Sequence, residues 1–447
     1  MKDTTLSLTN GNIKKGIIQF ALPIFLGNLF QQLYNVCDAF VVGNFVGKEA
    51  LAAISSTGSL IFLLVGFFSG LFSGVGVVIS KFYGAKDDDM IQKSVGNAIA
   101  FALICGVLLS FIGVVFTPNL LKLMGTPDSV FTDAVTYVRT YFGGIIFVVL
   151  YNAATGIFQA VGDSRHPLYY LLVSSVVNVV LDLLFVAVFG MGVLGAAIAT
   201  VIAQAVSVFL AFFRLSRIQQ VYRIVIKQIR FNSYITKQML AIGLPSGIQN
   251  SVIALANVVV QSNINFFGDT AMAGCGSYSK IEGFAFIPIM SFSISMTTFV
   301  SQNIGAKQYD RAKSGAKFGI LTSCILAEFI GVTFYLFAPQ LISLFSKETD
   351  VIQVGSLQAH TVTLFYFLLA FSHSLAGILR GAGKSTIPMF TMLICWCLIR
   401  VTYITIITKL SSNIQVIFWA YPLTWALSSS FFLYYYKRKN IFTPTPS

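Results

Sequence analysis

Polar residues inside an apolar N-terminal stretch are the first indication of chemistry in this sequence. Residues 20–47 are apolar enough to cross a bilayer, yet they include, at steps of three, four and three, Asn28, Gln31, Asn35 and Asp38. This spacing places the four side chains on one face of a helix. A carboxylate near the middle of a membrane costs roughly 2.5–3.5 kcal/mol on insertion scales, so we expect a chain that keeps Asp38 there to use it.

Two later apolar stretches carry further polar residues at helical spacing. These are Ser174, Asn178 and Asp182 in the first stretch and Thr200 and Gln204 in the second. Two carboxylates, an amide and a hydroxyl, if they converge, supply the oxygen ligands that a hard cation such as Na⁺ prefers. The same group could hold a proton, because a buried carboxyl group beside another carboxylate is difficult to ionise. These residues are compatible with either H⁺ or Na⁺ as the bound ion.

A purely structural interpretation of these residues is the alternative. Asp38 and Asp182 could simply form hydrogen bonds with neighbouring helices, as buried polar groups often do in membrane bundles. Asn or Ser would serve that purpose without the insertion cost of a charge, which favours a functional role.

The composition explains what must position these residues. Of 447 residues, 56% are hydrophobic and 10% are charged, and the mean hydropathy is +0.80. Soluble proteins average about 25% charged residues, and only helices or closed barrels span membranes. The short alternating segments of a barrel are missing from the sequence. We therefore expect an all-α integral membrane protein with twelve spans, at 15–42, 51–80, 94–118, 129–160, 167–190, 192–214, 234–264, 270–300, 315–338, 351–379, 387–408 and 413–436.

The formal charge of +13 would indicate nucleic-acid binding in a soluble protein, but here it belongs to the loops. With twelve spans, most of the 29 Lys and Arg residues fall on the side of the two termini. The positive-inside rule then places both termini in the cytoplasm of a multi-pass plasma-membrane protein that binds no nucleic acid. The six cysteines lie in apolar stretches without metal-ligand spacing, and the N-terminus has no cleavable signal pattern.

The two halves of the chain are copies of each other. SKFYGAK at 80–86 matches SQNIGAK at 301–307, QAVGDSRHP at 159–167 matches RGAGKSTIP at 380–388, and Pro23 corresponds to Pro245. Because each half has an even number of spans, the two six-helix lobes should be related by a pseudo-twofold axis along the membrane normal. The predicted domains are 1–213 and 234–447, joined by a cytoplasmic linker at 214–233. The repeated GAK predicts a helix-terminating glycine with a basic flank, or a conformational gate.

The copies differ at the candidate cation site. Asn178 corresponds to Ile399 and Asp182 to Tyr403, so the ion site is expected in the first lobe only. Glu282 in the second lobe could attract a cationic substrate, or it could be neutralised by Lys280 or Arg400. The candidates for a substrate cavity are Gln31, Asn35, Gln249, Asn257, Tyr278 and Glu282. Pro23 and Pro245 are expected to kink their helices. The sequence gives no role to Glu328, His360 and His373.

The chain resembles the MATE (multidrug and toxic compound extrusion) family over nearly its whole length. The resemblance rests on the motifs LYNVCDAFVVG, NVVLDLLFVAVFG and GAAIATVIAQ taken together with the paired GDSRHP and RGAGKSTIP loops. The resemblance implies an antiporter that exports cationic, amphipathic drugs in exchange for H⁺ or Na⁺ and rocks between inward and outward openings. It implies a first-lobe cation site of Asp38, Asn178, Asp182 and Thr200, no cofactor, and a monomer associated with antibiotic resistance. The acidic residues that another branch of the family has in helices seven and ten are missing here.

Two other function classes agree less well with the sequence. A flippase for a lipid-linked oligosaccharide precursor needs a cationic cavity for pyrophosphate, whereas only Arg139, Lys280 and Arg400 fall within the spans. An intramembrane enzyme is not expected, because the sequence has no HExxH motif, no GxGD-type aspartate pair and no matched Ser/His pair.

Overall fold

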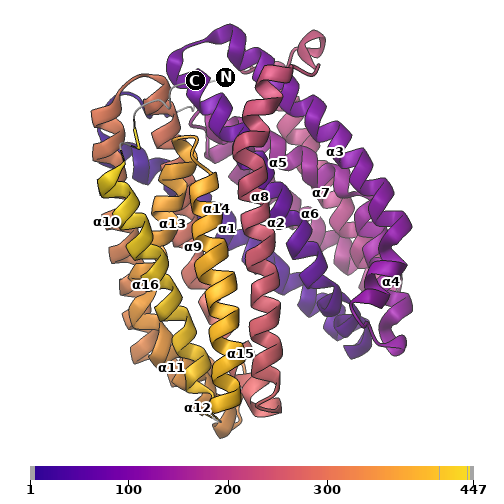
Figure 1. The fold of residues 1–447 in the computed structure, drawn as a ribbon. Helices are drawn as coiled ribbons and strands as arrows, with labels where there is room; N and C mark the ends of the chain where they lie inside the picture. Colours follow the sequence, from indigo (N-terminus) through magenta and orange to yellow (C-terminus); the bar gives the residue numbers. More distant parts are fainter. Residues whose placement is uncertain (1–5, 412, 440, 443–447) are drawn as a thin grey trace. The chain divides into compact units, whose positions relative to one another are not determined.

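The computed structural model describes residues 6–411, 413–439 and 441–442, without the side chains at positions 35, 36, 38–40, 48–56, 59, 60 and 62. The first half contains α1 (Ile13–Phe45), α2 (Lys48–Ala85), α3 (Asp88–Leu123), α4 (Asp128–Gly143), α5 (Ile145–Ala160), α6 (Arg165–Asp182), the π-helical turn η1 (Leu183–Val188), α7 (Gly192–Arg217) and the 3₁₀ turn η2 (Ile226–Gln228). Figure 1 follows the chain from indigo to yellow.

The second half repeats this pattern with more breaks. It contains α8 (Ser233–Asn265), α9 (Asp269–Gly305), α10 (Tyr309–Leu336), α11 (Ala338–Ile342), α12 (Thr349–Val362), the 3₁₀ turn η3 (Thr363–Phe365), α13 (Tyr366–Gly381), α14 (Thr386–Met392), the π-helical turn η4 (Leu393–Ile399), α15 (Arg400–Leu410) and α16 (Gln415–Arg438). Every regular element in the part of the chain described here is helical.

The prediction of an all-α polytopic membrane protein is confirmed. Over the described residues, 11 helical segments are long and apolar enough to cross a membrane. The pair α4 and α5, bent by 47° at a short break, makes up to 12. This pair covers the stretch 129–160, which the sequence predicted as one span. The bend lies at Gly144, between the two helices.

The chain forms two compact units. The first comprises Met1–Ser7 and Leu22–Gly243, and the second comprises Leu8–Ala21 and Leu244–Ser447. One division lies between Ser7 and Leu8, before α1, and the other two fall inside α1 and α8. The polar segment 214–233 therefore belongs entirely to the first unit. There, the side-chain oxygen of Asn97 accepts hydrogen bonds from the Asn232 backbone N–H at 2.7 Å and the Thr236 hydroxyl at 2.9 Å. The assignment of 1–213 and 234–447 as functional lobes stays a prediction.

Backbone geometry repeats between the halves at corresponding positions. The two non-glycine residues with positive φ among the described residues are Lys86 (φ 56) and Lys307 (φ 57), which end the paired GAK motifs. Gly162 (φ 89) and Gly383 (φ 77) correspond in the paired α5–α6 and α13–α14 loops. Left-handed backbone at matched sites supports the internal duplication that the motifs indicated.

The prediction that glycine ends the GAK helices holds for one copy only. Gly305 is the last residue of α9, whereas Gly84 lies within α2, which ends at Ala85. The left-handed residue in each copy is the lysine, whose backbone N–H bonds back to the helix, as Lys86 N does to Tyr83 O at 3.1 Å. A left-handed conformation costs a residue with a Cβ about 1–2 kcal/mol.

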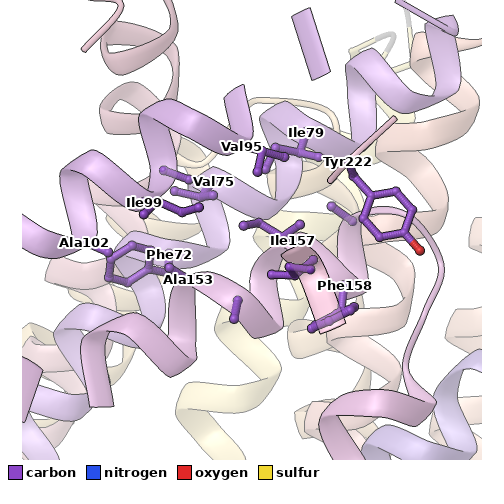
Figure 2. Close-up of a cluster of buried hydrophobic side chains, with 14 of the residues drawn as sticks. Phe72, Val75, Ile79, Val95, Ile99, Ala102, Ala153, Ile157, Phe158 and Tyr222 are labelled. Carbon is purple, nitrogen blue, oxygen red and sulfur yellow. The ribbon is translucent and has the colours of Figure 1, made fainter. Parts of the chain in front are cut away.

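The core of the first unit lies between α2, α3 and α5. Figure 2 shows apolar side chains of these helices meeting in one cluster, which Tyr222 from the polar segment adjoins. Each helix contributes residues three or four positions apart, such as Phe72, Val75 and Ile79 from α2, which places them on one face. Because segment 214–233 contributes the buried Tyr222, it packs against the core of the unit.

In the second unit, α9 packs against α10, α12 and α13. Hydroxyl groups hold α9 to the backbone of α13, where Ser293 donates to the carbonyl of His373 at 2.8 Å and Thr297 donates to that of Gly377 at 3.0 Å. These bonds satisfy buried hydroxyls between helices without introducing charge.

Candidate cation site and polar clusters

The polar face expected on α6 is present and buried. Ser174, Asn178 and Asp182 are 4%, 0% and 0% exposed. Ser174 donates its hydroxyl to the Leu171 carbonyl at 3.0 Å. Neither side-chain atom Nδ2 nor Oδ1 of Asn178 has a hydrogen-bond partner among the described residues. An unpaired buried polar atom costs about 1–3 kcal/mol, so the amide of Asn178 lacks a structural explanation within the helix bundle.

Asp182 lies where α6 changes geometry. It is the last residue of α6 and directly precedes the π-helical turn η1. Single π-helical turns within helices occur frequently at functional sites, because the extra residue turns the neighbouring side chains to a new direction. The carboxylate of Asp182 is therefore fully buried at a local irregularity of the helix.

Thr200 lies on α7, which packs against α6. Its side chain is 7% exposed, and its hydroxyl donates to the Ala196 carbonyl at 3.0 Å. Since the hydroxyl proton is used within the helix, the oxygen keeps its lone pairs for a cation. Three of the four expected ligands thus lie buried on two packed helices. Asp38 and Asn35 lie within α1, but their side chains are outside the described part of the structure, so the convergence of all four ligands stays a prediction.

A cavity of about 140 Å³ lies within the first unit. We call it the α1–α5–α6 cavity. It is lined by Pro23, Ile24, Gly27, Asn28, Gln31, Tyr151, Thr155, Gln159, Ser164, Pro167, Leu168 and Leu171. Gln31 and Pro23, both singled out from the sequence, thus share one cavity. Sequence analysis missed the residues from α5, Tyr151, Thr155 and Gln159, although their steps of four place them on one helical face.

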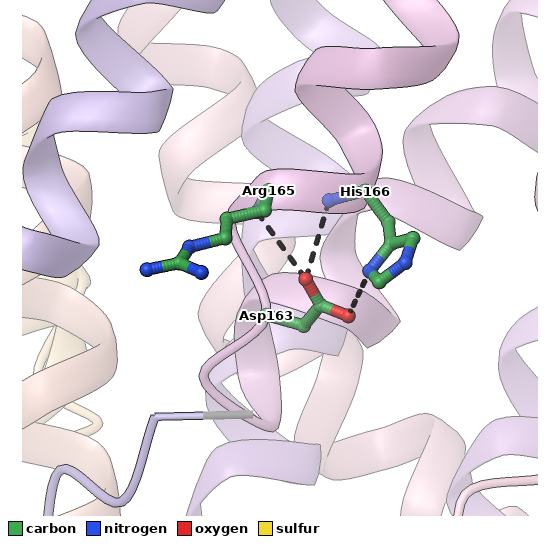
Figure 3. A network of polar contacts seen from close by, with 3 residues as sticks. All are labelled: Asp163, Arg165 and His166. Carbon is green, nitrogen blue, oxygen red and sulfur yellow. Dashed lines mark hydrogen bonds and ion pairs between the residues drawn. The ribbon is translucent and has the colours of Figure 1, made fainter. Parts of the chain in front are cut away.

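The loop between α5 and α6 is organised by a buried carboxylate that sequence analysis did not single out. Figure 3 shows Asp163 accepting hydrogen bonds from the backbone N–H groups of Arg165 and His166, both at 3.2 Å. Its other oxygen lies 2.6 Å from His166 Nδ1, and the carboxylate is fully buried. A carboxylate on the first N–H groups of a helix satisfies unpaired donors and opposes the helix dipole. Asp163 thus fixes the start of α6.

The corresponding position in the second half has the opposite charge. Lys384 stands there, before α14, and burial followed by the nearby charge of Lys439 lowers the pKa of its ammonium group. A cation at a helix N-terminus gains nothing from the helix dipole. The duplicated loops therefore differ electrostatically, as the candidate cation site does.

In the second unit, Tyr278 and Glu282 lie one turn apart on α9. The Tyr278 hydroxyl donates to Glu282 Oε1 at 3.1 Å and lies 2.9 Å from the hydroxyl oxygen of Tyr366, the first residue of α13. Tyr278 is 1% exposed and Tyr366 is 0% exposed, whereas Glu282 is partly exposed. Tyr278 anchors one oxygen of the carboxylate, and Tyr366 contacts the Tyr278 hydroxyl, while Glu282 keeps some access to its surroundings.

Neither proposed counterion pairs directly with Glu282. The two ion pairs found within the described residues are Lys93–Asp89 and His166–Asp163. Lys280 is exposed, with its ammonium 5.3 Å from the ring centre of Phe345. Arg400 is 2% exposed and donates to the Thr424 hydroxyl from Nε at 3.1 Å and from Nη2 at 2.8 Å.

The guanidinium of Arg400 also lies over two aromatic rings. Its Cζ is 4.7 Å from the ring centre of Tyr421 and 5.2 Å from that of Trp396. Cation–π contacts of this kind stabilise a poorly solvated guanidinium. Arg400 acts on Glu282 only at longer range, which leaves the carboxylate available to a cation.

The remaining candidates of the second unit lie in different surroundings. Gln249 on α8 is 3% exposed, and its amide nitrogen lies 2.9 Å from the sulfur of Met392. Asn257, two turns further along α8, is exposed. Pro245 lies inside α8, as Pro23 lies inside α1, and both helices continue through their prolines. Whether these prolines kink their helices stays a prediction.

Three residues without a role in the sequence now have structural explanations. Glu328 Oε2 accepts a hydrogen bond from the backbone N–H of Phe367 at 3.2 Å, near the start of α13. His360 Nε2 lies 3.1 Å from the Tyr335 carbonyl oxygen. His373 packs its ring edge-to-face on Trp396, with centroids 5.3 Å apart. Glu328 thus binds the start of a helix, and His373 packs against an aromatic ring while its buried Nε2 has no hydrogen-bond partner among the described residues.

Comparison with known proteins agrees with this architecture. The chain is 29% identical over 434 residues to the probable multidrug resistance protein YoeA of Bacillus subtilis (strain 168), with 94% of each chain covered. It is 29% identical over 394 residues to the probable multidrug resistance protein YpnP of the same strain, with 88% of each chain covered. The outward-facing structure of a multidrug resistance MATE family transporter of the MOP superfamily has the same fold, with a TM-score of 0.90, 22% identity and 98% of each chain covered.

The family model MatE matches the chain twice, once in each half. The matched residues are 23–184 and 245–406, which begin at Pro23 and Pro245. The double match is independent support for the duplication seen in the paired loops and left-handed residues. This multi-pass membrane protein, with its two copies of one helical unit and its buried α6 face, belongs to the MATE family.

Proposed function

We propose that the protein is a secondary active multidrug efflux antiporter that exports cationic, amphipathic compounds in exchange for H⁺ or Na⁺. Membership of the MATE family supports transport, and the names of the relatives support drugs as the substrate class. The transporter is proposed to work as a monomer in the plasma membrane, with both termini in the cytoplasm and without a cofactor.

The coupling site proposed in the first lobe consists of Asp38, Asn178, Asp182 and Thr200. The observation that carries this proposal is the amide of Asn178, fully buried and without a protein partner among the described residues, one turn from the fully buried Asp182. A cation or its hydrating water would satisfy the amide and offset part of the cost of burying the carboxylate.

Coupling follows from the energetics of the bound ion. A cation that enters from outside gains roughly 2.3 kcal/mol per charge for each 100 mV of membrane potential. This energy drives export only if the cation and the drug favour different conformations of the protein. Neutralising Asp38 and Asp182 would change the charge beside the α1 face and would allow the helix to bend at Pro23.

For the substrate, Glu282 is the proposed counterion in the second lobe. Its carboxylate has one hydrogen bond, from Tyr278, and no ion pair within the described residues. The other proposed contacts are Gln31, Asn35, Gln249, Asn257 and Tyr278. Because Gln249 and Tyr278 are buried, we assign the first contact with a drug to Glu282 and Asn257.

Ethidium efflux from proteoliposomes under separately imposed Na⁺ and H⁺ gradients tests this function. We expect one gradient to drive ethidium against its own concentration gradient, and that gradient identifies the coupling ion. Ethidium movement that responds to neither gradient would contradict the proposal.

Lipid flipping receives no support from the structure. Arg139 is exposed and donates to the Val114 carbonyl, and Arg400 is bound to Thr424. Lys280 lies over Phe345. Each of these three cationic side chains is therefore engaged by its own neighbours, which gives no support to a pyrophosphate site.

A further inference from the structure

The α1–α5–α6 cavity has a size that suits water and excludes a drug. Its volume is about 140 Å³. Pockets for drug-sized ligands occupy about 300–1,000 Å³. At roughly 30 Å³ for each molecule, the cavity has room for about four or five waters.

The lining of the cavity is polar but uncharged. It includes the amides of Asn28, Gln31 and Gln159 and the hydroxyls of Tyr151 and Ser164. No charged side chain is among the described residues that line it. Amide and hydroxyl groups give water or a passing monovalent cation several oxygen partners without trapping it as a carboxylate would.

Ser164 gives independent support for a polar occupant. Its side chain is 3% exposed, and its hydroxyl has no hydrogen-bond partner within the described part of the chain. It stands directly before α6, in the loop that Asp163 fixes, and it lines the cavity. A buried hydroxyl beside a cavity of this size is satisfied by water.

The cavity lies on the helix faces that lead to the proposed cation site. Gln31 on α1 is seven residues before Asp38, and Leu171 on α6 is seven residues before Asn178. Seven residues are about two helical turns, so each pair shares a face and is separated by about 10 Å along the helix. In the proposed topology, α1 and α6 both run from the cytoplasm outwards, which puts the cavity on the cytoplasmic side of the cation site.

We propose that the α1–α5–α6 cavity is the water-filled cytoplasmic vestibule of the coupling cation. The inference rests on the proposed antiport function and adds the route by which the ion leaves. A cation released from the Asp38 and Asp182 region passes the amide oxygens of Gln31 and Asn28. It reaches the cytoplasmic loop at Ser164 through the waters of the cavity. A proton uses the same waters as a relay.

Gly27 allows the cavity to be filled by mutation. A Cβ at this position would meet Leu171 and Leu168 at 3.8 and 3.9 Å, which are ordinary contacts, so Gly27→Ala is a matched control. Gly27→Leu carries three further carbons towards the cavity and displaces water. We expect Gly27→Leu to slow cation-driven ethidium efflux about tenfold or more, while Gly27→Ala stays within about twofold of the unmodified protein. Ethidium binding at equilibrium should be unchanged in both variants.

Leu171→Phe fills the cavity from α6, with Leu171→Met as its control. Efflux at the unmodified rate in both Gly27→Leu and Leu171→Phe overturns the vestibule. Loss of ethidium binding in parallel with efflux also overturns it, because the cavity would then belong to the drug. Absence of any cation-driven efflux by the unmodified protein is a different result, which refutes the proposed function itself.

Radiolytic hydroxyl-radical footprinting tests the waters without a mutation or a transport assay. Leu168 lines the cavity and Leu150 lies in the apolar core of the first unit, and they are 9% and 8% exposed. Because radicals form from nearby water, we expect oxidation of Leu168 to exceed that of Leu150 several-fold. Equal oxidation of the two leucines would overturn the proposal.

Discussion

Asn178 and Asp182 lie one turn apart on the same face of α6, and both side chains are completely buried. The helix changes to a π turn immediately after Asp182. The amide of Asn178 has no hydrogen-bond partner among the described residues, so this face is costly for stability. In the coupling site that we propose, a bound cation with its waters would offset that cost.

Replacing Asn178 by Leu should separate stability from transport. Leu has a similar size and no polar atoms, so the unpaired donor and acceptor disappear. We expect the free energy of unfolding to rise by about 1–3 kcal/mol. Cation-driven ethidium efflux should fall to background. Thermal unfolding in detergent and efflux assays of the same preparation check both outcomes. A destabilised Asn178→Leu protein would show that the amide is satisfied in the folded state.

The left-handed lysines predict a stabilising substitution. Lys86 and Lys307 are exposed and have φ values of 56 and 57. Glycine adopts this conformation without strain, so Lys86→Gly and Lys307→Gly should each stabilise the protein by about 0.5–1 kcal/mol. Lys81→Gly, at an exposed position inside α2, is the control and should destabilise by about 1 kcal/mol. Thermal unfolding of the three variants distinguishes these effects, and a loss of stability in the first two would refute the strain argument.

Substitutions of Asp163 should reduce stability to the extent that they remove its acceptor oxygens. Asp163→Ala removes the acceptor of two backbone N–H bonds and of the His166 ring contact, and should cost about 1–2 kcal/mol. Asp163→Asn keeps a carbonyl acceptor for the backbone and should retain more than half of that stability. Thermal unfolding measures both. If the Ala and Asn variants are equally stable, the carboxylate does not stabilise α6 through its N-terminus.

If the charge of the Glu282 carboxylate attracts the drug, removing that charge should weaken drug binding. Glu282→Gln keeps the acceptor for Tyr278 but removes the charge, so ethidium should bind about tenfold more weakly, a change of about 1.4 kcal/mol. Glu348→Gln, at an exposed position just before α12, is the control and should bind normally. Fluorescence titration of purified protein measures both affinities. Unchanged affinity in Glu282→Gln would place the cation elsewhere.

Hydrophobic runs and motif spacing predicted most of the architecture. The spans follow from apolar stretches that have only one stable form in lipid, and the duplication follows from paired loops at a constant offset. The buried face of Ser174, Asn178 and Asp182 follows from helical spacing alone. The sequence did not show that Lys86 takes the left-handed position of GAK, because glycine is the usual residue there.

Contacts between distant segments could not be predicted from the sequence. The role of Glu328 depends on such a contact, because its carboxylate lies 3.2 Å from the backbone nitrogen of Phe367. Arg400 and Thr424 likewise pair between helices that share no motif. The α1–α5–α6 cavity depends on how three helices pack, which residue spacing within one helix does not determine. The expected ligands Asp38 and Asn35 have side chains outside the described part of the structure, so their place in the site stays a prediction.

Cation-driven efflux by variants of the two carboxylates tests the central claim most directly. Asp38→Asn and Asp182→Asn are compared, in proteoliposomes under the productive gradient, with the unmodified protein and with Asp128→Asn, an exposed residue at the start of α4. We expect both site variants to insert and to bind ethidium, yet to lose gradient-driven export, while Asp128→Asn transports normally. Export at the normal rate by either site variant would contradict a coupling site in the first lobe.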